Sequence, residues 1–257
     1  MDLTTVTYEL RDHVATVTLN RPDAMNSFNQ AMLDDFARIW ARVRTDDDVH
    51  VVVLRAAGDR AFCTGVDVKE GIDRHPNVWT QDDPGEHLSP KANQVWKPLV
   101  CAVHGMAAGG AFYWINEADI VICSEDATFF DPHVSYGMTS ALEPIGLARR
   151  IPLGEVLRWA LIGLDERISA QTALRVGLVS EVVPREELWE HADRLARIIA
   201  AKPPAAIQGT VRAIWESLDS TRTQALRTGL SYTQLGNPIG TAQVERSSLQ
   251  RPKPTIR

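Results

Sequence analysis

The chain has 257 residues, of which 44% are hydrophobic and 23% charged, and its formal net charge is −6. This length and apolar content allow a sizeable buried core, compatible with one α/β domain plus an appendage. The acidic balance provides no basic stripe for nucleic acid or for an anionic membrane, so neither is an expected partner.

Several features indicate a cytoplasmic protein without a metal site. The three cysteines, Cys63, Cys101 and Cys123, lack the spacing of metal ligands and are odd in number. The first residues show no basic region followed by an apolar run, and no stretch approaches the roughly 20 apolar residues that span a bilayer. His75 and His87 are too far apart in sequence to indicate a metal ion.

The first predicted elements are a hairpin and a helix. Apolar and polar residues alternate in residues 6–10 and 17–19, which predicts two paired strands. From Gln30 to Arg44, apolar residues recur at helical spacing while charged residues take the other face, so this helix is expected to cover the sheet. Further strands are expected near residues 49–55, 99–103 and 119–123.

Two glycine segments each follow a strand-like run. The first is residues 62–67, Phe-Cys-Thr-Gly-Val-Asp, and the second is residues 104–110, His-Gly-Met-Ala-Ala-Gly-Gly. Glycine serves where a backbone turns tightly or lets a ligand approach closely. Two backbone N–H groups from such segments can converge on one oxygen and stabilise negative charge there by about 2.7–4 kcal/mol per donor.

The remaining chain divides into a loop and a helical region. Residues 71–93 lack periodicity and are predicted to form a long loop with a short helix. After Pro184 the sequence is mostly helical, and Pro203-Pro204 is expected to open one of the helices. The apolar spacing predicts helices over residues 187–200, 205–218 and 223–235.

The two glycine segments together resemble the oxyanion hole of the crotonase (enoyl-CoA hydratase) superfamily. Other stretches resemble landmarks of that superfamily in the same order, namely residues 19–26, 65–70, 118–121, 127–129, 168–173 and 177–179. The resemblance implies an α/β fold with a crotonase-like ββα spiral core over residues 1–200, which would carry the CoA site and the oxyanion hole. Residues 201–257 would form a helical trimerisation region.

The resemblance also implies the ligand and the residues that hold it. The substrate and partner would be an acyl-CoA bound by a homotrimer or a dimer of trimers, with no tightly bound cofactor and with coenzyme A present only as part of the substrate thioester. The backbone amides of Val66 and Gly110 would form the oxyanion hole. The residues expected to contact CoA are Ala24, Met25, Thr64, Asp67, Val68 and Lys69.

The two positions that carry catalytic glutamates in hydratases of this family have changed. The first falls on Tyr113, three residues after Gly110, and the second falls on His133 in the loop after the next strand. Histidine is a competent general base near neutral pH, and Asp131 is placed to orient its ring. Glu143 lies in a loop where isomerases and dehalogenases of the family often carry a working carboxylate.

Three functional hypotheses follow from these residues. In the first, His133 activates water with help from Asp131, Tyr113 or Glu143, in the hydrolysis or isomerisation of an oxidised acyl-CoA. In the second, Glu143 replaces the lost glutamates of an enoyl-CoA hydratase or isomerase. In the third, the protein binds acyl-CoA without catalysis.

Each catalytic candidate also has a purely structural interpretation. His133 would be a hydrogen-bonded residue in the wall of the site, and Tyr113 would line it by packing. Glu143 would stabilise the positive end of a helix dipole. Asp67 and Lys69 would be ordinary loop and surface residues. The sequence leaves these interpretations open.

Overall fold

The main sheet is built from six strands in the part of the chain that the computed structural model describes, residues 1–73, 76–245 and 253–256. In spatial order they are β1 (Val6–Arg11), β2 (Val14–Leu19), β3 (Val51–Ala56), β5 (Leu99–Val103), β7 (Ile120–Ser124) and β10 (Glu181–Val183). β1 and β2 form the predicted antiparallel hairpin, and all later neighbours pair in parallel.

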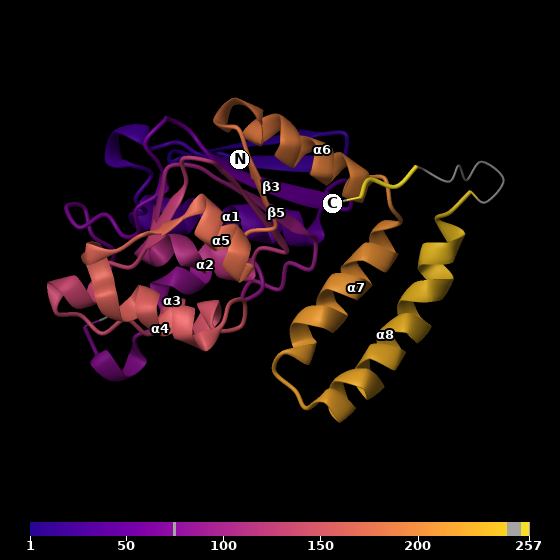
Figure 1. Ribbon diagram of the computed structural model, residues 1–257. Helices are drawn as coiled ribbons and strands as arrows, with labels where there is room; N and C mark the ends of the chain where they lie inside the picture. The colour runs from indigo at the N-terminus through magenta and orange to yellow at the C-terminus, as the bar shows by residue number, and fades with distance from the viewer. Residues whose placement is uncertain (74–75, 246–252, 257) are drawn as a thin grey trace.

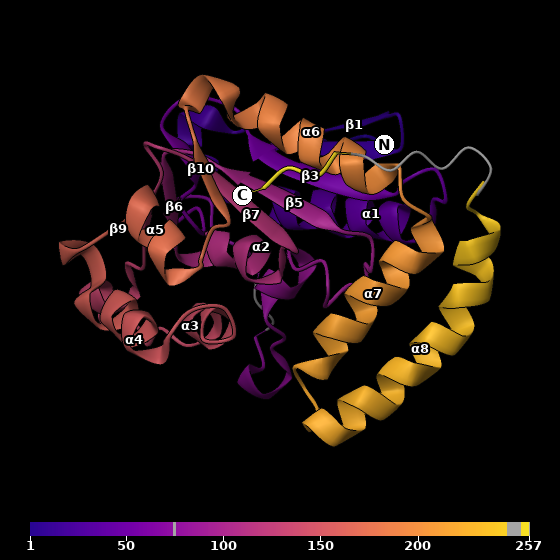
Figure 2. The same cartoon turned by 45° about the vertical axis from the view of Figure 1, so that its right-hand side comes forward.

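Helices cover both faces of this sheet, which explains why its parallel strands are almost continuously apolar. Val51 and Val53 of β3 pack in one cluster with α6 (Leu188–Ala200), whereas Val52 and Leu54 belong to the larger core on the opposite face. α1 (Gln30–Thr45) and α2 (Phe112–Glu117) contribute to that larger core. Figure 2 shows α6 on one side of β3, β5 and β7, with α1 and α2 on the other.

A smaller sheet brings the predicted site segments to one edge. It contains β4 (Ala61–Cys63), β6 (Met106–Ala108), β8 (Thr128–Phe130) and β9 (Ile168–Ser169). β4, β6 and β8 are parallel neighbours, so their carboxyl ends lie along the same edge. The first glycine segment continues from β4, the second from β6, and Asp131 directly follows β8.

Shorter helices complete the core. They are α3 (Leu142–Leu147), α4 (Leu153–Ile162) and α5 (Ala170–Val176). The loop predicted over residues 71–93 contains two short 3-10 helices, Val78–Thr80 and Pro84–His87. Within the described residues, no helix combines the length and apolarity needed to cross a bilayer.

The C-terminal helices stand to one side of the core as an antiparallel pair (Figures 1 and 2). α7 (Pro204–Ser217) begins at the expected proline, and α8 spans Arg222–Ala242. The predicted end of α8 at Leu235 is wrong, because the helix continues through Pro238. Gly240 lies so close to α7 that an added Cβ would sit 3.2 Å from the Ala206 Cβ, so packing between the two helices supports this last turn.

The predicted α/β class and the helical C-terminal region are confirmed. The predicted division into residues 1–200 and 201–257 stays a prediction, and residues 246–252 and 257 of the second part lie outside the described residues.

Candidate active site

The first glycine segment is held by a bridge to the chain just before α1. Phe28 N–H donates to the Gly65 carbonyl at 2.9 Å, and Asp67 N–H donates to the Phe28 carbonyl at 2.8 Å. In a parallel bridge of this kind, the residue between the two bonded neighbours directs its own N–H and C=O away from the partner strand. The Val66 N–H therefore points away from Phe28, leaving it available to the site.

The second glycine segment lies directly against the first. A Cβ added to Gly65, whose φ is +86°, would lie 3.3 Å from both the Gly110 nitrogen and the Ala108 carbonyl oxygen. A Cβ on Gly110 would approach the Phe28 ring to 2.5 Å, a distance that real Cβ atoms do not adopt. Glycine is thus required at both positions for the two segments to meet, and their contact brings the Val66 and Gly110 amides into one region.

His133 lies beside this region and is oriented by Asp131. A Cβ on Gly109 would lie 3.6 Å from His133 Cε1, which places the imidazole next to the second glycine segment. His133 Nδ1 is 2.5 Å from Oδ1 of Asp131, a fully buried carboxylate. This hydrogen bond raises the pKa of His133 above its ordinary value, against the opposing effect of partial burial. Nδ1 is therefore occupied, and Nε2 is the nitrogen left for a substrate or water.

Glu143 faces that second nitrogen. Its Oε1 lies 4.0 Å from His133 Nε2, longer than a hydrogen bond, so the two atoms are not bonded to each other and a small molecule beside them can reach both. Glu143 sits in the first turn of α3, and its backbone carbonyl accepts a 2.8 Å hydrogen bond from the Asn116 side chain of α2. Burial raises the pKa of the Glu143 carboxyl, which favours its protonated form as a proton donor.

Tyr113 is near the same region, but its hydroxyl is already engaged. The phenol O–H donates to Asp83 Oδ1 at 2.9 Å, and the ring packs on Gly85, where an added Cβ would lie only 2.0 Å from the Tyr113 Cζ. Asp83 also accepts from the Gly85 N–H at 3.0 Å. Burial, aided by the charges of Glu143 and Asp83, raises the pKa of the phenol, so it stays protonated and is no base near neutral pH.

The predicted CoA residues lie in two stretches of chain, residues 24–25 and 64–69, and Arg21 joins the second to the start of the first. Arg21 lies 3.0 Å from the buried Asp67 carboxylate, which also accepts hydrogen bonds from the Lys69 and Glu70 amides at 3.0 and 3.2 Å. Asp67 therefore holds the local backbone. Val68 and Lys69 are exposed, whereas Thr64, Ala24 and Met25 are partly buried. Met25 has a φ of +52° at the end of a 3-10 helix, Pro22–Ala24.

The sequence predictions thus fall into three groups. Val66, Gly110, His133, Asp131 and Glu143 come together at the edge of the smaller sheet. Tyr113 adjoins them through its ring, which lies 3.6 Å from where a Gly110 Cβ would be. The CoA candidates are linked to the site through the Phe28–Val66 bridge.

Four residues with clear roles in this geometry were missed by the sequence predictions. Arg21 pairs with Asp67, and Asn26 bonds Arg21 and the carbonyls of Ala57 and Ala61. Asp83 accepts the Tyr113 hydroxyl, and Ser140 donates to Asp131. Arg21 and Asn26 lie inside a stretch that the resemblance had marked, but Asp83 and Ser140 carry no local signal.

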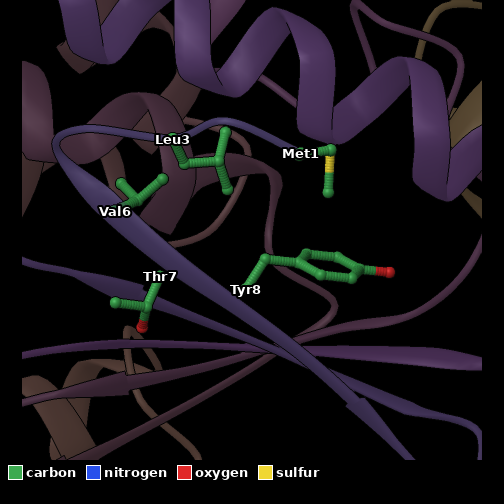
Figure 3. Close-up of a pocket in the computed structure, with 5 residues that line it drawn as sticks. All are labelled: Met1, Leu3, Val6, Thr7 and Tyr8. Atoms are coloured by element: carbon green, nitrogen blue, oxygen red, sulfur yellow. The ribbon is translucent and has the colours of Figure 1, made fainter.

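Other polar features lie apart from this site. His104, at the end of β5, is fully buried, and burial lowers its pKa to about 4. A hollow of about 220 Å³ along β1 is lined by Met1, Leu3, Val6, Thr7 and Tyr8, none of which is a predicted site residue (Figure 3). His87 is exposed, whereas His75 lies outside the described residues. No cluster of three or more potential metal ligands occurs among the described residues, and the absence of a metal stays a prediction.

Comparison with known proteins identifies the family. The family model described as enoyl-CoA hydratase/isomerase matches residues 9–249. The chain is 38% identical to (E)-benzylidenesuccinyl-CoA hydratase of Thauera aromatica, with 90% of this chain and 88% of the relative covered. It is 31% identical to the short-chain-enoyl-CoA hydratase of Clostridium acetobutylicum, with coverage of 83% and 82%.

Comparison with solved structures supports the same family assignment. The crystal structure of an enoyl-CoA hydratase/isomerase from Mycobacterium paratuberculosis superposes with a TM-score of 0.84 at 35% identity, covering 96% of this chain and 93% of that one. The expected crotonase-like fold is therefore confirmed. This chain belongs to the enoyl-CoA hydratase/isomerase family and is a crotonase-type acyl-CoA enzyme.

Proposed function

We propose that this enzyme adds water to the carbon–carbon double bond of an α,β-unsaturated acyl-CoA. The observation that carries this proposal is the environment of His133, whose Nδ1 is held by Asp131 while its Nε2 faces Glu143 at 4.0 Å. Hydration needs one group to activate water and another to deliver a proton. The family's named hydratases support this reaction over others of the fold.

The proposed reaction begins with His133. Nε2 removes a proton from water as the water oxygen forms a bond to Cβ of the acyl group. The electrons of the double bond move toward the thioester, and the resulting enolate oxygen accepts hydrogen bonds from the Val66 and Gly110 amides. Asp131 stabilises the protonated imidazole through Nδ1.

Glu143 completes the addition. Its carboxylic acid gives a proton to Cα, which turns the enolate into the β-hydroxyacyl thioester. The enzyme is left with protonated His133 and ionised Glu143, and transfer of one proton between them restores the starting state. Their 4.0 Å separation requires only a small movement or one bridging water for that transfer.

Substrate binding would use the two stretches of chain that Arg21 joins. In this proposal Ala24, Met25, Thr64, Asp67, Val68 and Lys69 border the CoA, which is present only as part of the thioester. Asp67 is a support for the loop because its carboxylate is already paired with Arg21. The backbone of residues 65–69 would contact CoA. The exposed Lys69 would be the side chain that pairs with a CoA phosphate.

The C-terminal helices would mediate assembly into a trimer or a dimer of trimers. α8 exposes Leu226, Leu230, Leu235 and Ile239 to between 58% and 70%, an unusual density of exposed apolar side chains on one helix. Light scattering coupled to size-exclusion chromatography would measure the assembled mass, and a monomer would contradict this part of the proposal.

A second candidate is hydrolysis of a carbon–carbon bond in a β-keto or cyclic diketo acyl-CoA. The Asp131–His133 pair favours it, because a histidine oriented by a buried carboxylate activates water for attack on a carbonyl as well as on an alkene. The oxyanion hole would then hold the enolate that leaves. Isomerisation using Glu143, and acyl-CoA binding without turnover, are the remaining alternatives.

One isotope experiment separates these reactions. A panel of enoyl-, β-keto- and cyclic diketo acyl-CoAs is incubated in water enriched in ¹⁸O and, separately, in D₂O, and the products are analysed by mass spectrometry. Hydration places ¹⁸O on Cβ and deuterium on Cα. Isomerisation gives deuterium without ¹⁸O, whereas carbon–carbon hydrolysis gives ¹⁸O in a new carboxylate.

The same panel with His133→Ala and Glu143→Gln assigns the residues. Loss of the hydrated product in both variants supports the proposal, with His87→Ala as a matched control in an exposed histidine. A cleaved product that is lost in His133→Ala but not in Glu143→Gln would show that the reaction is hydrolysis and not hydration. Tight binding of every acyl-CoA without conversion would indicate that the protein binds acyl-CoA without catalysis.

A further inference from the structure

Ser140 joins Asp131 and His133 in a chain of side-chain hydrogen bonds. Ser140 lies just before α3, and its Oγ donates to Oδ2 of Asp131. The other carboxylate oxygen, Oδ1, interacts with His133 Nδ1 at 2.5 Å and with the His133 backbone N–H at 3.4 Å. The two oxygens of one buried carboxylate are thus bound by different residues.

This arrangement is not that of a nucleophilic serine. In a serine hydrolase the serine hydroxyl bonds the imidazole, which takes its proton. Here the hydroxyl bonds the carboxylate, and the histidine lies at the other end of the chain. Ser140 is therefore not bonded to the imidazole that would take its proton in a serine hydrolase, and its available role is to hold Asp131.

Burial makes the second partner of Asp131 important. The Asp131 carboxylate has no exposed surface, and an ionised group in such a place is stable only when it is hydrogen-bonded and paired. A carboxylate fixed at one oxygen can still rotate about its Cβ–Cγ bond. With both oxygens bound, its plane is fixed, and so is the direction in which His133 Nε2 points.

We propose that Ser140 is a positioning residue that sets the orientation and the tautomer of His133 through Asp131. The role of His133 as the base rests on the proposed function, whereas its orientation does not. The charged groups acting on the imidazole are Asp131 from the turn after β8 and Glu143 from α3, with Asp83 of the loop acting on Glu143. Ser140 adds no charge, so its effect comes from geometry.

Nuclear magnetic resonance of the whole enzyme with ¹⁵N-labelled histidine tests this without any substrate. The His133 signals are assigned by their absence in His133→Ala. In the wild type we expect neutral His133 to carry its proton on Nδ1. In Ser140→Ala we expect a mixture of tautomers and a pKa of His133 that falls back toward its ordinary value, because the bond from Nδ1 to Asp131 loses its alignment.

Kinetics provide the second readout. Ser140→Ala should lower kcat by roughly 10-fold with little change in KM, by analogy with the loss of an outer hydrogen-bond partner that orients a metal-ligating histidine. Ser140→Thr, which keeps the hydroxyl, should restore both the tautomer and kcat. Thr139→Ala, in the exposed neighbouring residue, should match the wild type. If Ser140→Ala does not fold, Ser140→Cys gives the same comparison with a weaker donor of similar size.

The outcomes separate this inference from the proposed function. Wild-type tautomer and pKa in Ser140→Ala, with His133→Ala inactive, would overturn the role of Ser140 while leaving His133 as the base. Mixed tautomers in Ser140→Ala together with full activity of His133→Ala would establish the positioning and overturn the proposed function.

Discussion

The two positions that the family resemblance assigns to the hydratases' glutamates have very different surroundings. His133 belongs to a short stretch of chain in which Asp131 and Glu143 face the imidazole and Ser140 holds Asp131. Tyr113 is tied to a distant loop, with its hydroxyl on Asp83 and its ring on Gly85. At one position the pKa of the imidazole and that of the Glu143 carboxyl are both raised, by the Asp131 hydrogen bond and by burial respectively, whereas the other position holds a phenol whose pKa is raised by burial. Proton-transfer chemistry is therefore expected on the His133 side.

The largest effect should come from removing the imidazole. His133→Ala should lower kcat by about 10²–10⁴-fold, the range of general acid–base catalysis, because water then has no base. Acyl-CoA affinity, measured by calorimetry with an unreactive saturated thioester, should stay within a few-fold of the wild type. Turnover at the wild-type rate would show that the two sides do not differ in the way described.

Replacing Glu143, the proposed acid, should have the second-largest effect on turnover. Glu143→Gln keeps the size of the side chain and removes the ionisable proton, so kcat should fall by roughly 10²-fold. Exchange of the Cα proton of the β-hydroxyacyl product with D₂O, followed by mass spectrometry, should slow in parallel. An unchanged exchange rate would assign the proton to another group and reduce Glu143 to a helix-terminal acid.

Tyr113 and Asp83 provide a matched pair on the other side. Tyr113→Phe removes one hydrogen bond worth about 1 kcal/mol and should change KM more than kcat, by less than 10-fold. Asp83→Asn keeps an oxygen that accepts from Tyr113 and Gly85, so it should resemble the wild type in steady-state kinetics. If kcat fell as far in Tyr113→Phe as in His133→Ala, the phenol would be a proton donor. The difference proposed between the Tyr113 and His133 positions would then be wrong.

A second histidine sharpens the comparison through stability, with no expected effect on turnover. His104 has a folded-state pKa of about 4, below its ordinary value near 6.5, so the unfolded chain binds more protons between these values. Stability contributed by neutral His104 is present above about pH 6.5 and is lost as the pH falls. Urea unfolding should show about 2 kcal/mol of this loss at pH 5, absent in His104→Asn. An identical pH dependence in both proteins would contradict it.

Local sequence signals were sufficient for the first hairpin, α1 and the longer strands of the main sheet, but not for the short strands of the smaller sheet. The apolar runs of β3 and β5 and the glycines at 65 and 110 are each recognisable within a few residues, because a buried parallel strand and a close backbone approach impose their residue types locally. His133 was instead marked by the family resemblance, and Asp131 by lying two residues before it.

Long-range contacts account for what was missed. Asp83 is 30 residues from Tyr113, and nothing around it differs from an ordinary loop acid. Ser140 resembles any loop serine in the sequence, and only the fold places its hydroxyl against the Asp131 carboxylate. The extension of α8 past Pro238 depends on a neighbouring helix at Gly240, which outweighs the local cost of a proline.

Phe28 couples the two amides of the predicted oxyanion hole. Its backbone holds residues 65–67, and its ring occupies the space that a side chain at position 110 would need. The ring is itself fixed edge-on against Trp114, with centroids 6.3 Å apart. We expect a larger ring at this one buried residue to displace the Gly110 segment, because the Phe28 ring already fills the space beside Gly110. The distance between the two predicted donors therefore depends on a residue whose ring lies in the core and not in the site.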